Sequence, residues 1–264
     1  MKKILSLLLA FALVFAMAAC KPQVMDGDGM VREVTTLHVF AAASMTETLT
    51  ALESAWYALY PDTELVFTFD SSGTLKSQIE EGAECDVFIS AAQKQMNQLD
   101  ELGLIDPESR IDLLENKCAL VVPEGNPAGI ESYEDLGTDK LTLIALGDSD
   151  VPVGQYSEEI LTYMGLWDSL NNSKKITFGS NVKAVTSWVS EGTVDCGIVY
   201  GTDAAAADLQ VIAYPPEGSH SPIIYPAAMI AGSENEELAM NYLTFLQSLE
   251  AGAVFRAAGF TLVE

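Results

Sequence analysis

The unit that decides the fold is the stretch LHVFAAASMTETLTALESAWYAL, residues 37–59. Its first part, 37–42, is a short apolar run of the kind that forms a buried strand. Apolar side chains then recur in alternating steps of four and three, as on one face of a helix, at Met45, Leu49, Leu52, Trp56 and Leu59. The stretch therefore predicts a strand that passes directly into an amphipathic helix.

The same alternation continues along the chain. An extended run at 64–69 precedes a short helix that begins at Thr74 and stops at Gly82, and a strand at 86–90 follows. Strands that alternate with helices predict a parallel sheet with crossover helices.

The pattern then restarts in the second half of the chain. We expect strands at 118–122, 141–146, 175–178 and 196–200, with helices at 155–164 and 182–191. The segments QIEEG–DVFIS and WVSEG–CGIVY, at 78–90 and 188–200, even share one local shape. A further extended run, 223–230, precedes a final helical region at 236–257. The sequence therefore predicts an α/β protein with two lobes of similar plan.

The amino end has the pattern of an export signal. Lys2 and Lys3 precede an apolar run at 4–17, and small residues lead into Cys20 in a lipobox-like MAAC. A retained transmembrane helix is the alternative, but the run is shorter than the roughly 20 residues that a bilayer core requires. We predict a lipoprotein signal peptide at 1–19, lipidation of Cys20, and a lipid-anchored tether at 20–36 that holds the protein outside the cytoplasm on the cell membrane.

The composition excludes several kinds of partner and chemistry. A formal net charge of −25 makes nucleic acid an improbable partner and indicates a solvated acidic surface. Beyond Cys20, the three cysteines are odd in number and far apart, so they predict buried thiols rather than a disulfide framework: Cys85, Cys118 and Cys196.

Nothing in the sequence indicates catalysis. The two histidines, His38 and His220, belong to no cluster with metal-ligand spacing, and no G-x-S-x-G motif occurs. We predict no catalytic residue, no cofactor and no metal-cation ligand, so a binding protein is favoured over an enzyme.

The residues at the strand-to-helix turns indicate an anion site. Open α/β sheets bind ligands where strands end and helices begin, and four such turns carry small, hydroxyl, amide or glycine residues: 41–47, 70–74, 150–154 and 179–182. A helix amino terminus holds an anion without lysine or arginine, through free N–H groups and about half a positive charge. Each turn also has an ordinary explanation, because serine and asparagine cap helices everywhere, and Ser44 to Glu47 has the spacing of a capping box.

Four strings carry a resemblance to a known family. FAAAS at 40–44, SSGTL at 71–75, DVFISA at 86–91 and GIVYGTDA at 197–204 occur in the order and spacing of the periplasmic molybdate-binding proteins of ABC transporters. The chain resembles this family from about Leu37 to Phe260. The resemblance implies a type II periplasmic-binding-protein fold with a ligand cleft between its lobes. Lobe 1 would span 37–116, completed by 225–264, and lobe 2 would span 117–224, with crossovers near Asn116 and Tyr225.

The resemblance also implies the ligand contacts. Two serine hydroxyls, two main-chain N–H groups and a tyrosine hydroxyl would hold the oxyanion, at Ser44, Ser72, Val153, Val182 and Tyr200. Position 153 is often alanine in the family, but a main-chain donor survives a change to valine. Asp70 and Asp150 lie beside these positions, and we predict that both carboxylates point away, because an inward one would oppose a dianion.

The function implied by the resemblance is that of a monomeric transport receptor. Such a protein closes on molybdate or tungstate and delivers it to the permease of an ABC transporter. A receptor for sulfate or another tetrahedral oxyanion is the alternative within the same class, since it would use the same helix ends. An enzyme, or a sensory domain of the same fold, is the alternative from a different class.

Overall fold

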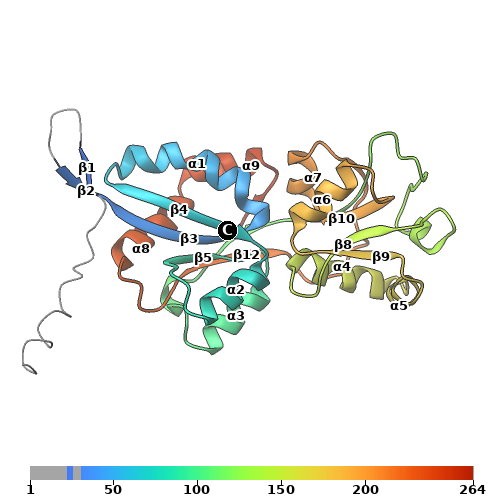
Figure 1. The fold of residues 1–264 in the computed structure, drawn as a ribbon, viewed down its shortest axis with the longest axis horizontal. Coiled ribbons are helices and arrows are strands. Elements are labelled where there is room, and N and C mark those ends of the chain that lie inside the picture. The colour runs from blue at the N-terminus through green and yellow to red at the C-terminus, as the bar shows by residue number, and fades with distance from the viewer. Residues whose placement is uncertain (1–22, 26–30, 264) are drawn as a thin grey trace, which may run out of the picture.

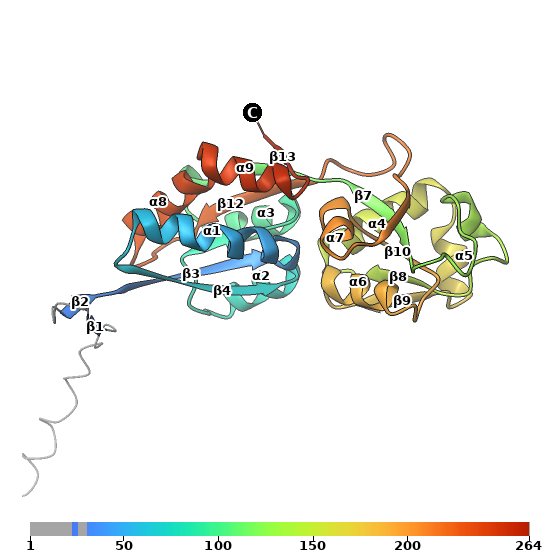
Figure 2. The same ribbon diagram turned by 90° about the horizontal axis from the view of Figure 1, so that it is seen from above.

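The computed structural model describes residues 23–25 and 31–263 and shows two α/β lobes side by side (Figures 1 and 2). The signal peptide predicted at 1–19 and the lipidated Cys20 lie outside the described residues. Within the predicted tether, β1 (Gln23–Met25) pairs antiparallel with β2 (Val31–Glu33), and β3 already begins at Thr35.

The first lobe is built on a six-stranded sheet in the order β13-β6-β12-β5-β3-β4. Its strands are β3 (Thr35–Ala42), β4 (Thr63–Asp70), β5 (Val87–Ile89), β6 (Ile111–Glu115), β12 (Ile224–Met229) and β13 (Thr261–Leu262). β3 is parallel to β4 and β5, but β12 is antiparallel to β5 and β6. The predicted parallel sheet is therefore a mixed one. The reason is that β12 returns from the second lobe and so runs opposite to the strands that lead toward it.

Helices cover both faces of this sheet. One face is covered by α1 (Thr46–Leu59), α8 (Glu236–Leu246) and α9 (Leu249–Ala257), and the other by α2 (Ser72–Glu80) and α3 (Gln93–Glu101). Neighbouring strand residues point to opposite faces, so Val39 packs in the first core and Phe40 in the second. Burial on both faces explains why the central strands read as continuous apolar runs.

The second lobe contains a five-stranded sheet in the order β11-β7-β10-β8-β9. Its strands are β7 (Cys118–Val122), β8 (Ile144–Gly147), β9 (Ile176–Gly179), β10 (Cys196–Tyr200) and β11 (Gln210–Ala213). Its helices are α4 (Pro152–Tyr163), α5 (Trp167–Asn172), α6 (Val182–Ser190) and α7 (Gly201–Ala206). β8 is parallel to β9 and β10, whereas β7 is antiparallel to β10 and β11.

Two segments connect the lobes. The first crossover joins β6 to β7 through Asn116 and Lys117, and the second, 214–223, joins β11 to β12. The Asn116 N–H donates to the Ile223 carbonyl at 3.1 Å, so the two crossovers run side by side. In the part of the chain that the structure describes, no helix is long and apolar enough to span a membrane.

The three cysteines of the lobes are buried and unpaired. Cys85 lies beside β5, Cys118 in β7 and Cys196 in β10. Burial raises the pKa of each thiol well above its ordinary value, which keeps the thiols protonated and unreactive.

Candidate functional site

All five predicted contact residues line one small cavity between the lobes. The first lobe contributes Ala42, Ala43, Ser44, Asp70, Ser71, Ser72 and Ala91, and the second contributes Val151, Pro152, Val153, Val182 and Tyr200. The cavity volume is about 10 Å³, close to the room that one buried water needs. Sites for organic ligands are far larger, at roughly 300 Å³ or more. The cavity is therefore far smaller than a site for an organic ligand.

The first lobe offers two buried serine hydroxyls to this cavity. Ser72 Oγ accepts a hydrogen bond from the Ala91 N–H at 2.9 Å, and Ser44 Oγ lies 2.9 Å from Tyr225 Oη. Ser71, in contrast, acts as the ordinary N-cap of α2, because its Oγ accepts from the Thr74 N–H at 3.1 Å. Both adjacent serines line the cavity, but the Ser71 hydroxyl caps α2 and the Ser72 hydroxyl does not.

The capping box expected from Ser44 to Glu47 is not formed. Ser44 lies in a 3₁₀ turn, Ala43–Met45, so α1 begins only at Thr46 and its N-cap is Met45, which makes no side-chain cap bond. The Ser44 hydroxyl instead forms a hydrogen bond with Tyr225, and the Glu47 carboxylate forms an ion pair with Lys183 in the other lobe. Because this extra turn precedes the helix, the spacing of Ser44 and Glu47 wrongly suggests a capping box.

The second lobe presents main-chain donors at two helix starts. Val153 lies in the first turn of α4, directly after Pro152, and Val182 is the first residue of α6. Asn181 caps α6 with its Oδ1, which accepts from the Ala184 N–H at 3.0 Å. First-turn N–H groups have no acceptor within their own helix, and the helix dipole adds about half a positive charge there. Both valines thus offer a main-chain donor that does not depend on their side chains.

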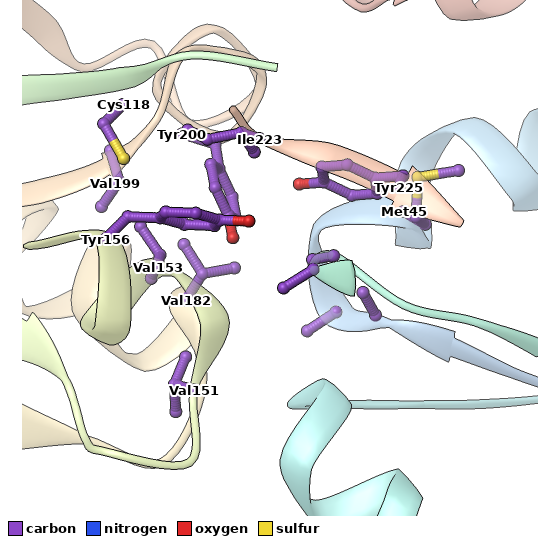
Figure 3. Close-up of a cluster of buried hydrophobic side chains, with 14 of the residues drawn as sticks. Met45, Cys118, Val151, Val153, Tyr156, Val182, Val199, Tyr200, Ile223 and Tyr225 are labelled. Carbon is purple, nitrogen blue, oxygen red and sulfur yellow. The ribbon is translucent and has the colours of Figure 1, made fainter. Parts of the chain in front are cut away.

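Tyr200 adds a hydroxyl at the end of β10. Its side chain is 1% exposed, and its Oη has no hydrogen-bond partner among the described residues. Figure 3 shows the hydroxyls of Tyr200 and Tyr156, and that of Tyr225 from the other lobe, pointing toward the space between the lobes. Burial raises the pKa of Tyr200 well above its ordinary value, so the phenol stays protonated and able to donate. A buried hydroxyl without a partner costs about 1–3 kcal/mol, which a bound acceptor would relieve.

The two aspartates beside the site differ from one another. Asp70 is one of the residues that line the cavity, and its Oδ1 accepts from the Ser71 N–H at 2.7 Å and from Asn181 Nδ2 at 3.1 Å. These two donors hold the carboxylate and make it a bridge between the lobes. Asp150 is exposed and does not line the cavity, but its main chain lies so close to Gly73 that a Cβ there would collide with it.

An ion pair also links the lobes beside Val182. Lys183 Nζ lies 2.8 Å from both carboxylate oxygens of Glu47 in the first lobe and 3.0 Å from Asp203 Oδ1 in its own lobe. Burial raises the pKa of Asp203 to about 6, although Lys183 counteracts the shift. With the Asn181–Asp70 bond, the start of α6 is held to the first lobe on both sides of Val182.

Two α/β lobes that are joined by two crossovers and enclose a small cavity have the architecture of a solute-binding protein. The chain belongs to the bacterial extracellular solute-binding protein family, whose pattern matches residues 37–261. The family resemblance drawn from the sequence is thereby confirmed. The predicted location outside the cytoplasm is confirmed with it. The family consists of binding proteins rather than enzymes.

Three relatives illustrate the match. The chain is 36% identical to the molybdate-binding protein ModA of Haemophilus influenzae, over 84% of this chain and 89% of that protein. It is 34% identical to the putative ABC transporter substrate-binding lipoprotein YvgL of Bacillus subtilis, over 96% and 95%. The structure of the Azotobacter vinelandii periplasmic molybdate-binding protein has a TM-score of 0.77 at 25% identity, covering 86% of this chain and 100% of that one. The predicted type II periplasmic-binding-protein fold is confirmed.

Proposed function

We propose that this protein captures molybdate or tungstate in the interlobe cavity and delivers it to the permease of an ABC transporter. The observation that carries the proposal is the convergence of neutral donors on a cavity too small for an organic solute. The donors are the hydroxyls of Ser44, Ser72 and Tyr200 and the main-chain N–H groups of Val153 and Val182. The names of the relatives support molybdate as the ligand.

The arrangement binds an anion without a cation. Each hydrogen bond to a charged ligand contributes about 1.5–3 kcal/mol. The starts of α4 and α6 add the favourable ends of two helix dipoles. The strongly acidic surface does not prevent this, because charges farther than roughly 8 Å are screened at physiological salt. The site holds and releases its ligand without a chemical step, so we propose a receptor and not an enzyme.

Calorimetric titration of the soluble part of the chain, starting after Cys20, tests the ligand. We expect molybdate and tungstate to bind with one ion per chain, sulfate to bind much more weakly, and phosphate not to bind. The Glu47–Lys183 and Asp70–Asn181 contacts between lobes imply that binding is coupled to closure, which small-angle scattering would show as a smaller radius of gyration. Tight binding of sulfate or phosphate without any binding of molybdate would refute the proposal.

We further propose that the mature protein is a monomer anchored to the membrane through a lipidated Cys20. The basic start, apolar run and MAAC string support a lipoprotein signal, and one relative over 96% of the chain is named a lipoprotein. Mass spectrometry of the membrane fraction should find acyl chains on Cys20. The Cys20→Ser variant should instead lose the acyl chains, and an unmodified cysteine in the membrane fraction of cells making the unsubstituted protein would contradict the anchor.

A further inference from the structure

The Ser44 hydroxyl is one end of a chain of hydrogen bonds that runs from the cavity to the junction of the lobes. Ser44 Oγ lies 2.9 Å from Tyr225 Oη, which lies 3.2 Å from Asn116 Nδ2. The same Nδ2 lies 2.9 Å from Thr202 Oγ1 in the second lobe. Asn116 belongs to the first crossover, and Tyr225 is the second residue of β12, the strand that the second crossover enters. The chain of bonds therefore connects a proposed ligand contact with both connections between the lobes.

Asn116 sets the direction of the protons in this chain. Its Oδ1 accepts from the Lys117 N–H at 2.8 Å, so the NH₂ group is the end of the amide that faces Tyr225 and Thr202. An amide NH₂ group donates and cannot accept. Tyr225 Oη therefore accepts one amide proton, and Thr202 Oγ1 accepts the other.

The phenolic proton of Tyr225 then has one available hydrogen-bond acceptor among the described residues. Tyr225 is fully buried, and burial raises the pKa of its hydroxyl well above the ordinary value, so the proton stays on the oxygen. Among the described residues, Ser44 Oγ is the neighbour that is left to accept it. If Ser44 donated to Tyr225 instead, the phenolic proton would be buried without an acceptor, at a cost in free energy. Tyr225 is therefore the donor and Ser44 the acceptor.

We propose that Tyr225 and Asn116 are positioning residues that commit the Ser44 hydroxyl to donate its own proton into the cavity. The proposal rests on the proposed function, since it gives that proton an oxyanion to meet. The Ser72 hydroxyl is oriented in the same way by a different donor, because its Oγ accepts from the Ala91 main-chain N–H. Both serines proposed as ligand contacts are thus held as donors, Ser72 by its own lobe and Ser44 by residues at the lobe junction.

A thermodynamic cycle of molybdate affinity tests the proposal. Tyr225→Phe removes the donor to Ser44 while keeping the ring, which packs at 5.8 Å from Tyr200 and 5.4 Å from Phe260. We expect this variant to weaken molybdate binding about threefold to tenfold, the range for one hydrogen bond. In a Ser44→Ala background the same change should alter affinity by less than about twofold, because Tyr225 acts through Ser44. In a Ser72→Ala background it should keep its full effect.

The matched control is Tyr242→Phe. It removes another buried tyrosine hydroxyl of the first lobe, one without a partner among the described residues and remote from the cavity lining. Molybdate affinity should stay unchanged in every background. If Tyr225→Phe does not fold, the cycle is run with Asn116→Ala, which removes the proton that orients the phenol, with the same expected dependence on Ser44.

The positioning role and the proposed function would be refuted by different results. An equal loss of affinity for Tyr225→Phe with and without the Ser44 hydroxyl, or no loss at all, would overturn the positioning role while leaving the receptor intact. Failure of the unsubstituted protein to bind molybdate or tungstate would instead refute the proposed function.

Discussion

The two lobes bring different chemistry to the same cavity. The proposed contacts of the first lobe are side-chain hydroxyls, those of Ser44 and Ser72, whereas those of the second lobe are the main-chain N–H groups of Val153 and Val182 together with the Tyr200 hydroxyl. A side-chain donor disappears with a single substitution, but a main-chain donor survives any residue except proline. The first-lobe half of the site should therefore be sensitive to side-chain identity, and the second-lobe valines should be tolerant of it.

The largest expected effect comes from removing the two serine hydroxyls that the first lobe contributes to the proposed site. Ser44→Ala combined with Ser72→Ala removes two hydrogen bonds to the anion, so molybdate affinity should fall by about 3–6 kcal/mol, or about 10²-fold to 10⁴-fold, by calorimetry. Ser71→Ala is the matched control, because Ser71 lines the same cavity but caps α2. It should lower stability by about 1 kcal/mol without the affinity loss. Normal binding by the double variant would remove the first lobe from the site.

The tyrosine of the second lobe gives the next largest effect. Tyr200→Phe should weaken binding by about 3 kcal/mol, near 150-fold, because the hydroxyl is fully buried and an anion would be its first partner. The same variant should leave the ligand-free protein equally or more stable in thermal unfolding, since it removes an unsatisfied buried group. Tyr242→Phe should match the effect on stability while leaving affinity unchanged. Parallel losses of affinity in both variants would show that the Tyr200 effect is not a contact.

A main-chain donor can be removed by proline at the start of a helix. Val182 is the first residue of α6, a position that accepts proline without loss of a helical bond, and Asn181 before it is extended. Val182→Pro should therefore weaken molybdate binding by about 1.5 kcal/mol, or about tenfold, with α6 intact by circular dichroism. Val182→Ala should bind within about twofold of the unsubstituted protein. If Val182→Ala lowers molybdate affinity as much as Val182→Pro, the contact is made by the side chain of Val182. The proposed difference between side-chain donors in the first lobe and main-chain donors in the second would then be wrong.

The sequence predicts the elements whose signals are local. The helix that becomes α1 and the strands β7 and β10 lie where their apolar patterns place them. α3 escaped prediction because it is mostly polar, with Met96 and Leu99 as its buried apolar residues. Short strands such as β6, β11 and β13 depend on pairing with distant segments. Local patterns thus predict most of the layers but not the direction of the returning strand.

The site was predictable in composition but not in connectivity. The four turns and the family strings name five residues that the structure brings to one cavity, because each lies at the end of a strand or in the turn after it. Contacts that tie the site together join residues far apart in the chain: Ser44 and Tyr225 are 181 positions apart, and Asp70 and Asn181 are 111 apart. For the same reason the bond between Asp70 and the Asn181 amide was not predicted, since the amide comes from the other lobe.

The smallest expected effect concerns the ion pair that joins the two lobes. Glu47→Gln removes the partner of Lys183 in the first lobe, while Asp203 still pairs with the lysine. Because the side chains of Glu47 and Lys183 are 55% and 31% exposed, the pair contributes only about 0.2–1 kcal/mol to closure. The dissociation constant should therefore rise up to about fivefold at low salt.

Salt separates this contact from the donors in the cavity. The Glu47→Gln effect should disappear near 1 M salt, where the screening length is about 3 Å, whereas the loss caused by the serine substitutions should persist. Glu53→Gln is the matched control, because it makes the same change of charge on α1 at a residue without an ion pair among the described residues. A Glu47→Gln effect that is independent of salt, or equal to that of Glu53→Gln, would mean that the pair does not hold the lobes together. Closure would then depend on the ligand and on the other contacts between the lobes, such as the Asp70–Asn181 bond.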